Sequence, residues 1–289
     1  MPLHSSHAQA IAETLDSAAR EGRLVPMLTS TEPDLTVADA YFIQELSRNL
    51  RQDGGDRQVG MKMGLTSLAK MRQMGVHTPI YGFLAESMLA PDGATLDMSR
   101  LVQPRIEPEI AFILGADLRG PTTPAQAMLA VSGICAALEV LDSRYEDYRF
   151  NLPDVVADNA SGAHFVLGSH VAPPGRLDIS NLGMVLSING RIREVGSSAA
   201  IFEHPARSLA RLATMLAERD RHLEAGQIVL AGGATAAVEI APGDWVRLEV
   251  EGLGTVNVRC GAKEPPVAQP ATGQRRPTQE DPADGPGDA

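Results

Sequence analysis

Residues 105–113, with the sequence RIEPEIAFI, form the stretch on which the interpretation of this chain depends. Apolar and charged side chains alternate along it, and in a β-strand successive side chains point to opposite faces of the sheet. Glu107 and Glu109 therefore share one face, while Ile106 and Ile110 share the other. The pattern predicts a strand with one apolar face and two carboxylates on the opposite face.

A second apolar run, CAALEVL at residues 135–141, carries Glu139. Carboxylates in such segments are costly to bury without a positive partner. If the three glutamates face one point, they form an all-oxygen site of the kind that Mg²⁺ or Mn²⁺ occupies in preference to zinc. Spacing alone leaves an alternative open, in which two glutamates of a strand face solvent and Glu139 is unrelated to them.

Composition excludes several classes of protein. A chain of 289 residues, 44% hydrophobic, is long enough for one large domain or two small ones. The net charge of −11 argues against a nucleic-acid partner, because phosphate binding needs clustered Lys and Arg. No apolar stretch is long enough to cross a bilayer, and the first residues lack the features of a signal peptide. We expect a cytoplasmic protein in which Cys135 and Cys260 are reduced, buried thiols.

The first 57 residues are predicted to form a helical segment. Apolar residues at helical spacing indicate one helix over residues 7–22. Thr36 is a suitable N-cap for a second helix that continues to Leu50, and the DGGD sequence at residues 53–56 is expected to end it.

Residues 58–263 are predicted to form a strand-rich catalytic domain, so that the fold class is α+β. Asn189-Gly190 predicts a two-residue hairpin, and Pro205 suits the first turn of a helix over residues 205–219. Short apolar runs separated by Gly, Pro and Asp predict the strands, at residues 59–63, 106–114, 133–141, 163–167, 184–188, 227–231, 245–250 and 254–259.

Lys62 is the first candidate catalytic residue. It lies between Met61 and Met63 in an apolar predicted strand, and its partial burial favours either a carboxylate partner or loss of its proton. A surface lysine on an edge strand is the alternative. The adjoining Gly64-Leu65-Thr66-Ser67 offers hydroxyl and amide groups that suit an anionic substrate.

Three other polar segments are candidates for substrate binding. Arg105 precedes Glu107 by two residues and therefore lies on the same strand face. There it either neutralises the negative charge of the glutamates or holds a substrate carboxylate; a surface ion pair is the alternative. Asp158-Asn159-Ala160-Ser161 either supplies polar groups to the site or forms a capped turn. Gly232-Gly233-Ala234-Thr235 is expected to form a bend whose backbone amides can bind the second end of a dicarboxylate. Asp142, Arg144 and Tyr145 are expected at the mouth of the site if the strand ends there.

Five motifs occur in order along the chain, and together they resemble the hydratase/decarboxylase branch of the fumarylacetoacetate hydrolase superfamily. The resemblance spans roughly residues 10 to 260. The motifs are GMKMGLTS at residues 60–67, MGV and PIYG at 74–76 and 79–82, PRIEPEIAF at 104–112, LEVLDSRY at 138–145, and VADNAS at 156–161.

The resemblance implies a distorted β-roll and an active-site role for Lys62. It also implies a metal site in which Glu107, Glu109 and Glu139 hold Mg²⁺ or Mn²⁺, with Leu65, Thr66, Ser67, Arg105, Ser161, Gly233 and Thr235 as substrate-binding residues. The implied reaction is that of a carboxy-lyase, the loss of CO₂ from 2-oxo-3-hexenedioate in the meta-cleavage degradation of aromatic compounds. A homo-oligomer and a complex with the hydratase of the same pathway are further expectations.

Two other functions remain open. A 2-oxopent-4-enoate hydratase shares the metal site and the lysine motif, but related hydratases carry an acidic residue, in Pro-Asp-Phe-Gly, where this chain has Ile80. The bend at residues 232–235 also resembles the decarboxylases. A non-catalytic partner subunit on the same fold is the second alternative, and retention of Lys62 with all three glutamates argues against it.

Residues 264–289 are predicted to be a disordered tail, because they carry six prolines and few large apolar side chains. Burial of so little apolar surface cannot offset an ordering cost of roughly 1–2 kcal/mol per residue. Truncation after Ala262 should therefore leave the melting temperature and the activity unchanged, as thermal denaturation and a turnover assay would show. A marked loss of either would indicate that the tail docks on the body or on a partner.

Overall fold

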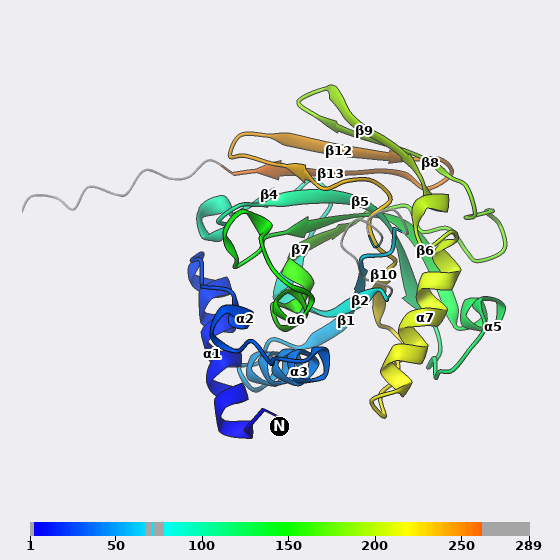
Figure 1. The fold of residues 1–289 in the computed structure, drawn as a ribbon. Helices are drawn as coiled ribbons and strands as arrows, with labels where there is room; N and C mark the ends of the chain where they lie inside the picture. The colour runs from blue at the N-terminus through cyan, green and yellow to red at the C-terminus, as the bar shows by residue number, and fades with distance from the viewer. Residues whose placement is uncertain (1–2, 68–70, 72–77, 262–289) are drawn as a thin grey trace, which may run out of the picture.

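The computed structural model describes residues 3–67, 71 and 78–261, and the predicted tail lies outside the described residues. N-terminal helices stand beside a strongly curved arrangement of two sheets (Figure 1). The helices are α1 (Ser5–Glu21), α2 (Leu28–Thr31), α3 (Val37–Asp53), α5 (Pro124–Leu129), α6 (Leu152–Ala157) and α7 (Pro205–Ala217). Single 3₁₀ turns are η1 (Glu86–Met88), η2 (Met98–Arg100), η3 (Glu146–Tyr148), η4 (Asn159–Ser161) and η5 (Ser198–Ala200).

The larger sheet has the order β2-β1-β10-β5-β6-β7-β3, with β11 also pairing with β5, and the smaller has the order β4-β13-β12-β8-β9. The long antiparallel pair β5–β6 lies near the middle of the larger sheet. The strands are β1 (Gln58–Gly64), β2 (Ile80–Ala85), β3 (Leu89–Ala90), β4 (Thr95–Leu96), β5 (Arg105–Leu114), β6 (Val131–Leu141), β7 (Gly162–Leu167), β8 (Gly183–Ile188), β9 (Arg191–Ser197), β10 (Ile228–Leu230), β11 (Val238–Glu239), β12 (Trp245–Val250) and β13 (Gly254–Cys260).

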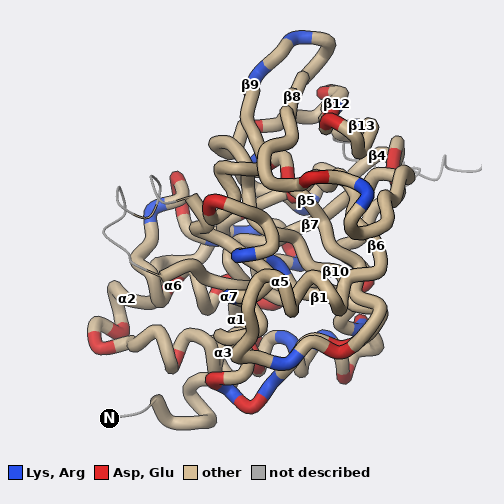
Figure 2. The backbone as a smooth tube through the Cα atoms, turned by 90° about the vertical axis from the view of Figure 1, so that its right-hand side faces the viewer, with Lys and Arg blue, Asp and Glu red and all other residues tan. Residues whose placement is uncertain are grey.

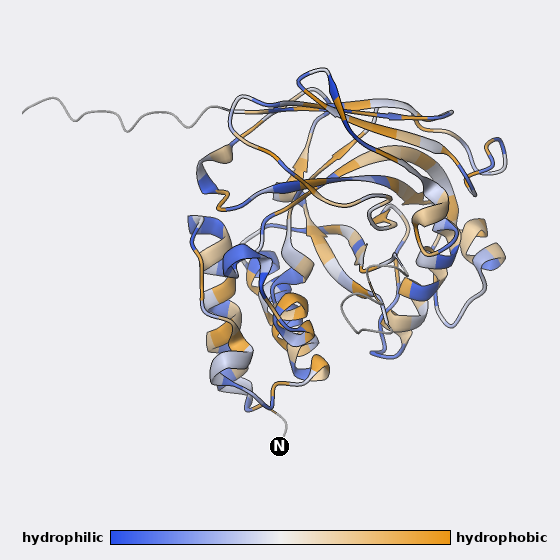
Figure 3. Cartoon of the chain, turned by 45° about the horizontal axis from the view of Figure 1, so that its top comes forward, coloured by the Kyte–Doolittle hydropathy of each residue, from blue (hydrophilic) through white to orange (hydrophobic). Residues whose placement is uncertain are grey.

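The helices α1 and α3 pack on each other, and α3 also packs on α6. Helix α3 begins as predicted, because the Thr36 hydroxyl accepts a hydrogen bond from the Asp39 amide and the Asp39 carboxylate accepts one from the Thr36 amide. Figure 3 shows hydrophobic and hydrophilic residues interspersed along these helices. None of the helices within the described ranges combines the length and the apolar composition needed to cross a bilayer.

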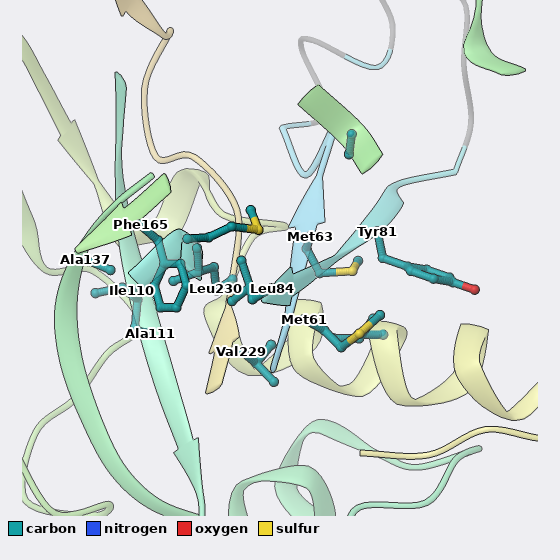
Figure 4. Close-up of a cluster of buried hydrophobic side chains, with 14 of the residues drawn as sticks. Met61, Met63, Tyr81, Leu84, Ile110, Ala111, Ala137, Phe165, Val229 and Leu230 are labelled. Carbon is teal, nitrogen blue, oxygen red and sulfur yellow. The ribbon is translucent and has the colours of Figure 1, made fainter. Parts of the chain in front are cut away.

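One hydrophobic core extends between the two sheets and between the larger sheet and the helices beside it. Figure 4 shows Met61 and Met63 of β1, Leu84 of β2, Ile110 of β5 and Phe165 of β7 among its members, all of them buried. In β1 and β5 the apolar side chains alternate with Lys62 and the glutamates, so that burial of the apolar face fixes which face these charged side chains occupy.

Pro108 lies within the central strand β5, where a residue without an N–H group is rarely tolerated. It is accommodated because β10 pairs with Ile113 to Ala111 and β11 with Ile106 and Arg105, which leaves β5 unpaired on that side at Pro108. A bend at residues 231–234 fills the interruption, and the Ala234 amide donates to the Pro108 carbonyl at 2.9 Å.

The predicted fold class is confirmed, an α+β protein with N-terminal helices followed by a curled mixed sheet. The Asn189-Gly190 hairpin is confirmed as well, with φ of 54° and 73° at its two residues. It projects from the body with Lys or Arg at its tip (Figure 2). Strand β2 had not been predicted, because all six of its residues are buried and its sequence has no alternation. The domain boundaries at residues 57 and 263 stay a prediction.

Candidate active site

The three glutamates lie on one face of the β5–β6 pair. Glu107 is directly opposite Glu139 in the antiparallel register, and Glu109 follows Glu107 by two residues. Their exposed fractions are 9% for Glu107, 0% for Glu109 and 2% for Glu139. The alternative in which two glutamates face solvent is therefore wrong.

Burial and mutual repulsion alter the ionisation of this group. Burial, together with the charges of Glu139 and Glu107, raises the pKa of Glu109 well above its usual value. Burial also raises the pKa of Glu139, although Lys62 opposes that effect. The two carboxyl groups therefore influence each other's ionisation, and the protonated form of Glu109 is favoured while no cation other than Lys62 is near. Among the described residues, Glu109 Oε1 has no hydrogen-bond donor.

Lys62 of β1 supplies positive charge to this cluster. Its side chain is 2% exposed, its ammonium forms an ion pair with Glu139 Oε1, and Nζ donates a hydrogen bond of 2.8 Å to the Ala160 carbonyl. The alternative of a surface lysine is wrong. The structure instead gives Lys62 the carboxylate partner that its apolar neighbours required.

The Ala160 carbonyl belongs to an unusual turn, η4. Asn159, Ala160 and Ser161 have φ values of 49°, 49° and 58°, and each costs about 1–2 kcal/mol relative to the right-handed region. The Asn159 side chain anchors the turn to β2, since Oδ1 accepts from the Phe83 amide at 2.8 Å and Nδ2 donates to the Phe83 carbonyl at 3.0 Å. The turn therefore holds the carbonyl that orients Lys62.

The bend at Gly232 and Gly233 packs against the glutamates. The Gly232 amide donates to Glu109 Oε2 at 2.8 Å. A Cβ at Gly233 would lie 2.0 Å from Glu107 Oε2, so only glycine leaves room for that carboxylate. The sequence interpretation considered this bend for substrate binding, and the structure places it next to the carboxylates of β5.

A cavity of about 110 Å³ opens in front of Lys62, Glu107 and Glu139. Most of the predicted site residues line it, including Leu65, Thr66, Ser67, Ser161 and Gly233. The residues that it brings together come from β1, β5, β6, the turn η4 and the glycine bend, which are far apart in sequence.

Three predicted site residues do not line the cavity. Glu109 lies buried behind it, in contact with Glu139. The Arg105 guanidinium lies over the Tyr148 ring, 4.1 Å from the centroid, and pairs with Glu239 at 3.5 Å. The Thr235 hydroxyl donates to the Ala236 carbonyl at 3.0 Å.

Asp142, Arg144 and Tyr145 do not form the mouth of the site, and that expectation is wrong. Asp142 accepts hydrogen bonds from the amides of residues 102 and 103, and Arg144 is paired with Asp158. All four side chains are buried, because the chain turns inward after β6 and uses them to fix its own loops.

Sequence reasoning missed the apolar part of the cavity wall, which consists of Met63, Leu141, Tyr148, Phe150, Val155 and Ala160. Leu141 could have been found, because it follows Glu139 by two residues and so shares its face. Tyr148 and Phe150 lie beyond the end of β6, where no periodic pattern predicts the direction of a side chain.

The carboxylate group suits a hard divalent cation. Its donors are all oxygens, Glu109 Oε1 lacks a hydrogen-bond donor among the described residues, and the Lys62 ammonium is paired with Glu139. Over the described ranges, no group of three or more His, Cys, Asp and Glu side chains already has the spacing of a metal site. The assignment of Glu107, Glu109 and Glu139 as ligands therefore stays a prediction that the donor chemistry supports.

Known proteins resemble this chain over most of its length. The model of the fumarylacetoacetate (FAA) hydrolase C-terminal family matches residues 57–260. A 4-oxalocrotonate decarboxylase of a Pseudomonas species is 48% identical over 247 residues, 86% of this chain and 95% of that protein. A 2-hydroxyhexa-2,4-dienoate hydratase from Comamonas testosteroni is 37% identical over 250 residues, 86% of this chain and 95% of that protein.

A solved structure is also similar, the 4-oxalocrotonate decarboxylase from Pseudomonas putida G7 complexed with magnesium and adipate. It superposes with a TM-score of 0.88 at 42% identity, over 89% of this chain and 98% of that chain.

Substitution of Gly233 tests the packing of the bend against Glu107. Gly233→Ala should displace the Glu107 carboxylate, because the added methyl group cannot occupy the same space. We expect a loss of Mn²⁺ affinity of at least about tenfold, in the range of a disturbed ligand orientation, measured by calorimetry. Gly183→Ala is the control, since its Cβ would meet only a Glu251 oxygen at 3.6 Å. Equal Mn²⁺ affinities in both variants would contradict the argument.

Proposed function

The chain belongs to the fumarylacetoacetate hydrolase family, and from that membership we propose that it is a metal-dependent decarboxylase of 2-oxo-3-hexenedioate, also called 4-oxalocrotonate. The products are CO₂ and 2-oxopent-4-enoate or its enol, 2-hydroxypenta-2,4-dienoate, in the meta-cleavage degradation of aromatic compounds. The observation that carries the proposal is the buried Lys62–Glu139 ion pair beside Glu107 at the cavity. Identity to the decarboxylase, 48%, also exceeds identity to the hydratase, 37%.

We assign Glu107, Glu109 and Glu139 as ligands of Mg²⁺ or Mn²⁺. When bound there, the ion supplies Lewis-acid polarisation of the 2-oxo carbonyl of the substrate. The glutamates provide the negative charge that retains it, and the glycine bend keeps Glu107 and Glu109 in place. Leu65, Thr66, Ser67, Ser161 and Gly233 line the cavity and are assigned to substrate binding; Arg105 and Thr235, predicted with them, lie outside its lining.

Lys62 acts on the negative charge that develops as CO₂ leaves. Its ammonium is held from two sides, by Glu139 and by the Ala160 carbonyl, so that little reorganisation is needed during the reaction. Two roles agree with this position: stabilisation of the developing charge, and donation of a proton to the product.

The apolar wall favours loss of CO₂ over addition of water. Ile80, Leu141 and Val155 line the cavity together with two aromatic side chains. Such a wall offers little hydration to the far carboxylate, whose charge disappears in the reaction. A hydratase would need a group that orients water, and Ile80 cannot do so.

Partners and location remain proposals. The substrate is a small dicarboxylate, and we propose a homo-oligomer in the cytoplasm that associates with the hydratase consuming its product. Both cysteines are buried and free, in agreement with a reducing compartment.

Removal of the ammonium tests Lys62. Lys62→Met should lower kcat by about 10²–10⁴-fold, the usual contribution of a positioned proton donor or acceptor. Folding and Mn²⁺ binding should persist at saturating metal, because the ion compensates Glu139; without metal the melting temperature should fall, since a buried carboxylate is left unpaired.

Lys62→Arg distinguishes the two roles of the lysine. It retains the charge but scarcely gives up a proton, so substantial turnover in this variant indicates stabilisation of charge rather than proton transfer. Unchanged kcat in Lys62→Met would reduce Lys62 to a structural role.

Ile80 tests the choice between decarboxylase and hydratase. Ile80→Asp places a second negative charge near the far carboxylate, where repulsion at about 4 Å costs roughly 4 kcal/mol at an effective dielectric constant near 20. We expect kcat/KM for 2-oxo-3-hexenedioate to fall by at least about 100-fold under saturating Mg²⁺. The neutral variant Ile80→Asn is the matched control and should lose less.

The same assay tests the proposed function. Wild-type protein should release CO₂ from 2-oxo-3-hexenedioate and should hydrate 2-oxopent-4-enoate poorly. Efficient hydration without CO₂ release would replace the decarboxylase by a hydratase, and absence of both activities with metal bound would favour a non-catalytic subunit.

A further inference from the structure

Tyr148 lies between Arg105 and the cavity. Tyr148 lines the cavity with Lys62 and Glu139, whereas Arg105 lines a neighbouring hollow with Asp147. The Arg105 guanidinium lies over the Tyr148 ring at 4.1 Å from its centroid. One ring face is therefore covered by a cation, and Arg105 is separated from the cavity by the ring.

The register of β5 and β6 indicates how far Tyr148 lies from the carboxylates. Glu107 is opposite Glu139, and two residues further along the same face Arg105 is opposite Leu141. Two residues of a strand extend over about 7 Å. This length is comparable to that of an extended six-carbon dicarboxylate, so a substrate whose 2-oxo acid end lies at the glutamates reaches Tyr148 with its far end.

The backbone at Tyr148 is held in a conformation that a bulky residue seldom adopts. Asp147 and Tyr148 have φ values of 54° and 55°. The Gln103 side chain fixes this loop: its Oε1 accepts from the Asp147 amide at 3.0 Å, and its Nε2 donates to the carbonyls of Ser143 and Tyr145 at 2.8 and 2.6 Å. Strain maintained by surrounding contacts is typical of functional positions.

Tyr148 lines the cavity and its hydroxyl oxygen is fully buried, from which we infer that the ring borders the cavity. The hydroxyl is buried and lies beside the Ser143 amide, on the side of the loop. Phe150 stands next to the ring with a centroid distance of 6.4 Å and also lines the cavity. The two rings form an aromatic wall, which suits the flat, conjugated carbon chain of the proposed substrate.

We propose that Tyr148 is a specificity-determining substrate contact whose ring packs against the far end of the bound dicarboxylate, and that Arg105 is a positioning residue acting through that ring. The inference rests on the proposed function. The face of an aromatic ring is electron-rich and repels a carboxylate, and a cation on the opposite face offsets that repulsion. Arg105 thus makes the wall tolerant of an anion without forming an ion pair that would stabilise the carboxylate against its loss as CO₂.

A double-mutant cycle tests whether Arg105 acts through Tyr148. Calorimetry with Mg²⁺ would measure Kd for adipate, a non-reactive six-carbon dicarboxylate, in wild type, Arg105→Gln, Tyr148→Phe, Tyr148→Leu and the double variants. Arg105→Gln should raise Kd about tenfold in wild type and in Tyr148→Phe, which keeps the ring, and less than twofold in Tyr148→Leu. Pyruvate, which has only the near end, should bind equally to all variants.

Two results would overturn the proposal. An Arg105→Gln effect of equal size in the Tyr148→Leu background would mean that Arg105 contacts the ligand directly. Unchanged adipate binding in Tyr148→Leu, or no adipate binding by the wild type, would remove the ring as a contact. Arg149→Gln, an exposed residue of the same loop, is the control for folding and should bind both ligands as wild type does.

The cycle also separates this proposal from the proposed function, because it measures binding and not turnover. If Arg105 and Tyr148 are coupled in adipate binding but the protein releases no CO₂, the proposed aromatic contact stands and the proposed decarboxylase activity is wrong. If the protein turns over 2-oxo-3-hexenedioate but the two residues are not coupled in adipate binding, the decarboxylase activity stands and the proposed aromatic contact is wrong.

Discussion

Compensation of buried negative charge is the constraint on which the site depends. Glu107, Glu109 and Glu139 share one face of the β5–β6 pair, where burial raises the pKa of Glu109 and of Glu139. Lys62 is paired with Glu139, and the Gly232 amide adds a hydrogen bond to Glu109. Such a group is stable only if positive charge or shared protons offset the repulsion, and this requirement supports the proposal that it holds a hard divalent ion.

Three backbone irregularities make that arrangement sterically feasible. Pro108 interrupts the pairing of β5, and the interruption admits the bend at Gly232 and Gly233 beside the glutamates. The left-handed turn at residues 159–161 turns the Ala160 carbonyl toward Lys62. Each of these features is unfavourable locally and is maintained by contacts from other elements, which is how strain at functional sites is usually held.

The cavity combines a charged end with an apolar end, and this division suits the reaction. In the proposed binding mode, the 2-oxo acid end of the substrate lies at the glutamates and Lys62. Ile80, Leu141, Tyr148 and Phe150 also line the cavity, and in the proposed binding mode they offer no hydration to the far carboxylate.

Local pattern in the sequence was sufficient for the regular elements and for part of the site. Alternation placed Glu107 and Glu109 on one face, the Thr36 cap and the Asn189-Gly190 turn marked element ends, and the ordered motifs identified Lys62 and Glu139. These signals are local, since side-chain direction in a strand follows from parity alone.

Only the tertiary structure decided the rest. The register that sets Glu107 opposite Glu139, the Ala160 carbonyl on Lys62, and the position of Tyr148 between Arg105 and the cavity all join segments distant in the chain. Asp142, Arg144 and Tyr145 were misplaced for the same reason: they follow β6, where the direction of the chain is set by packing against other elements. A sequence determines such contacts only through the free energy of the whole fold, so no local sequence pattern predicts them.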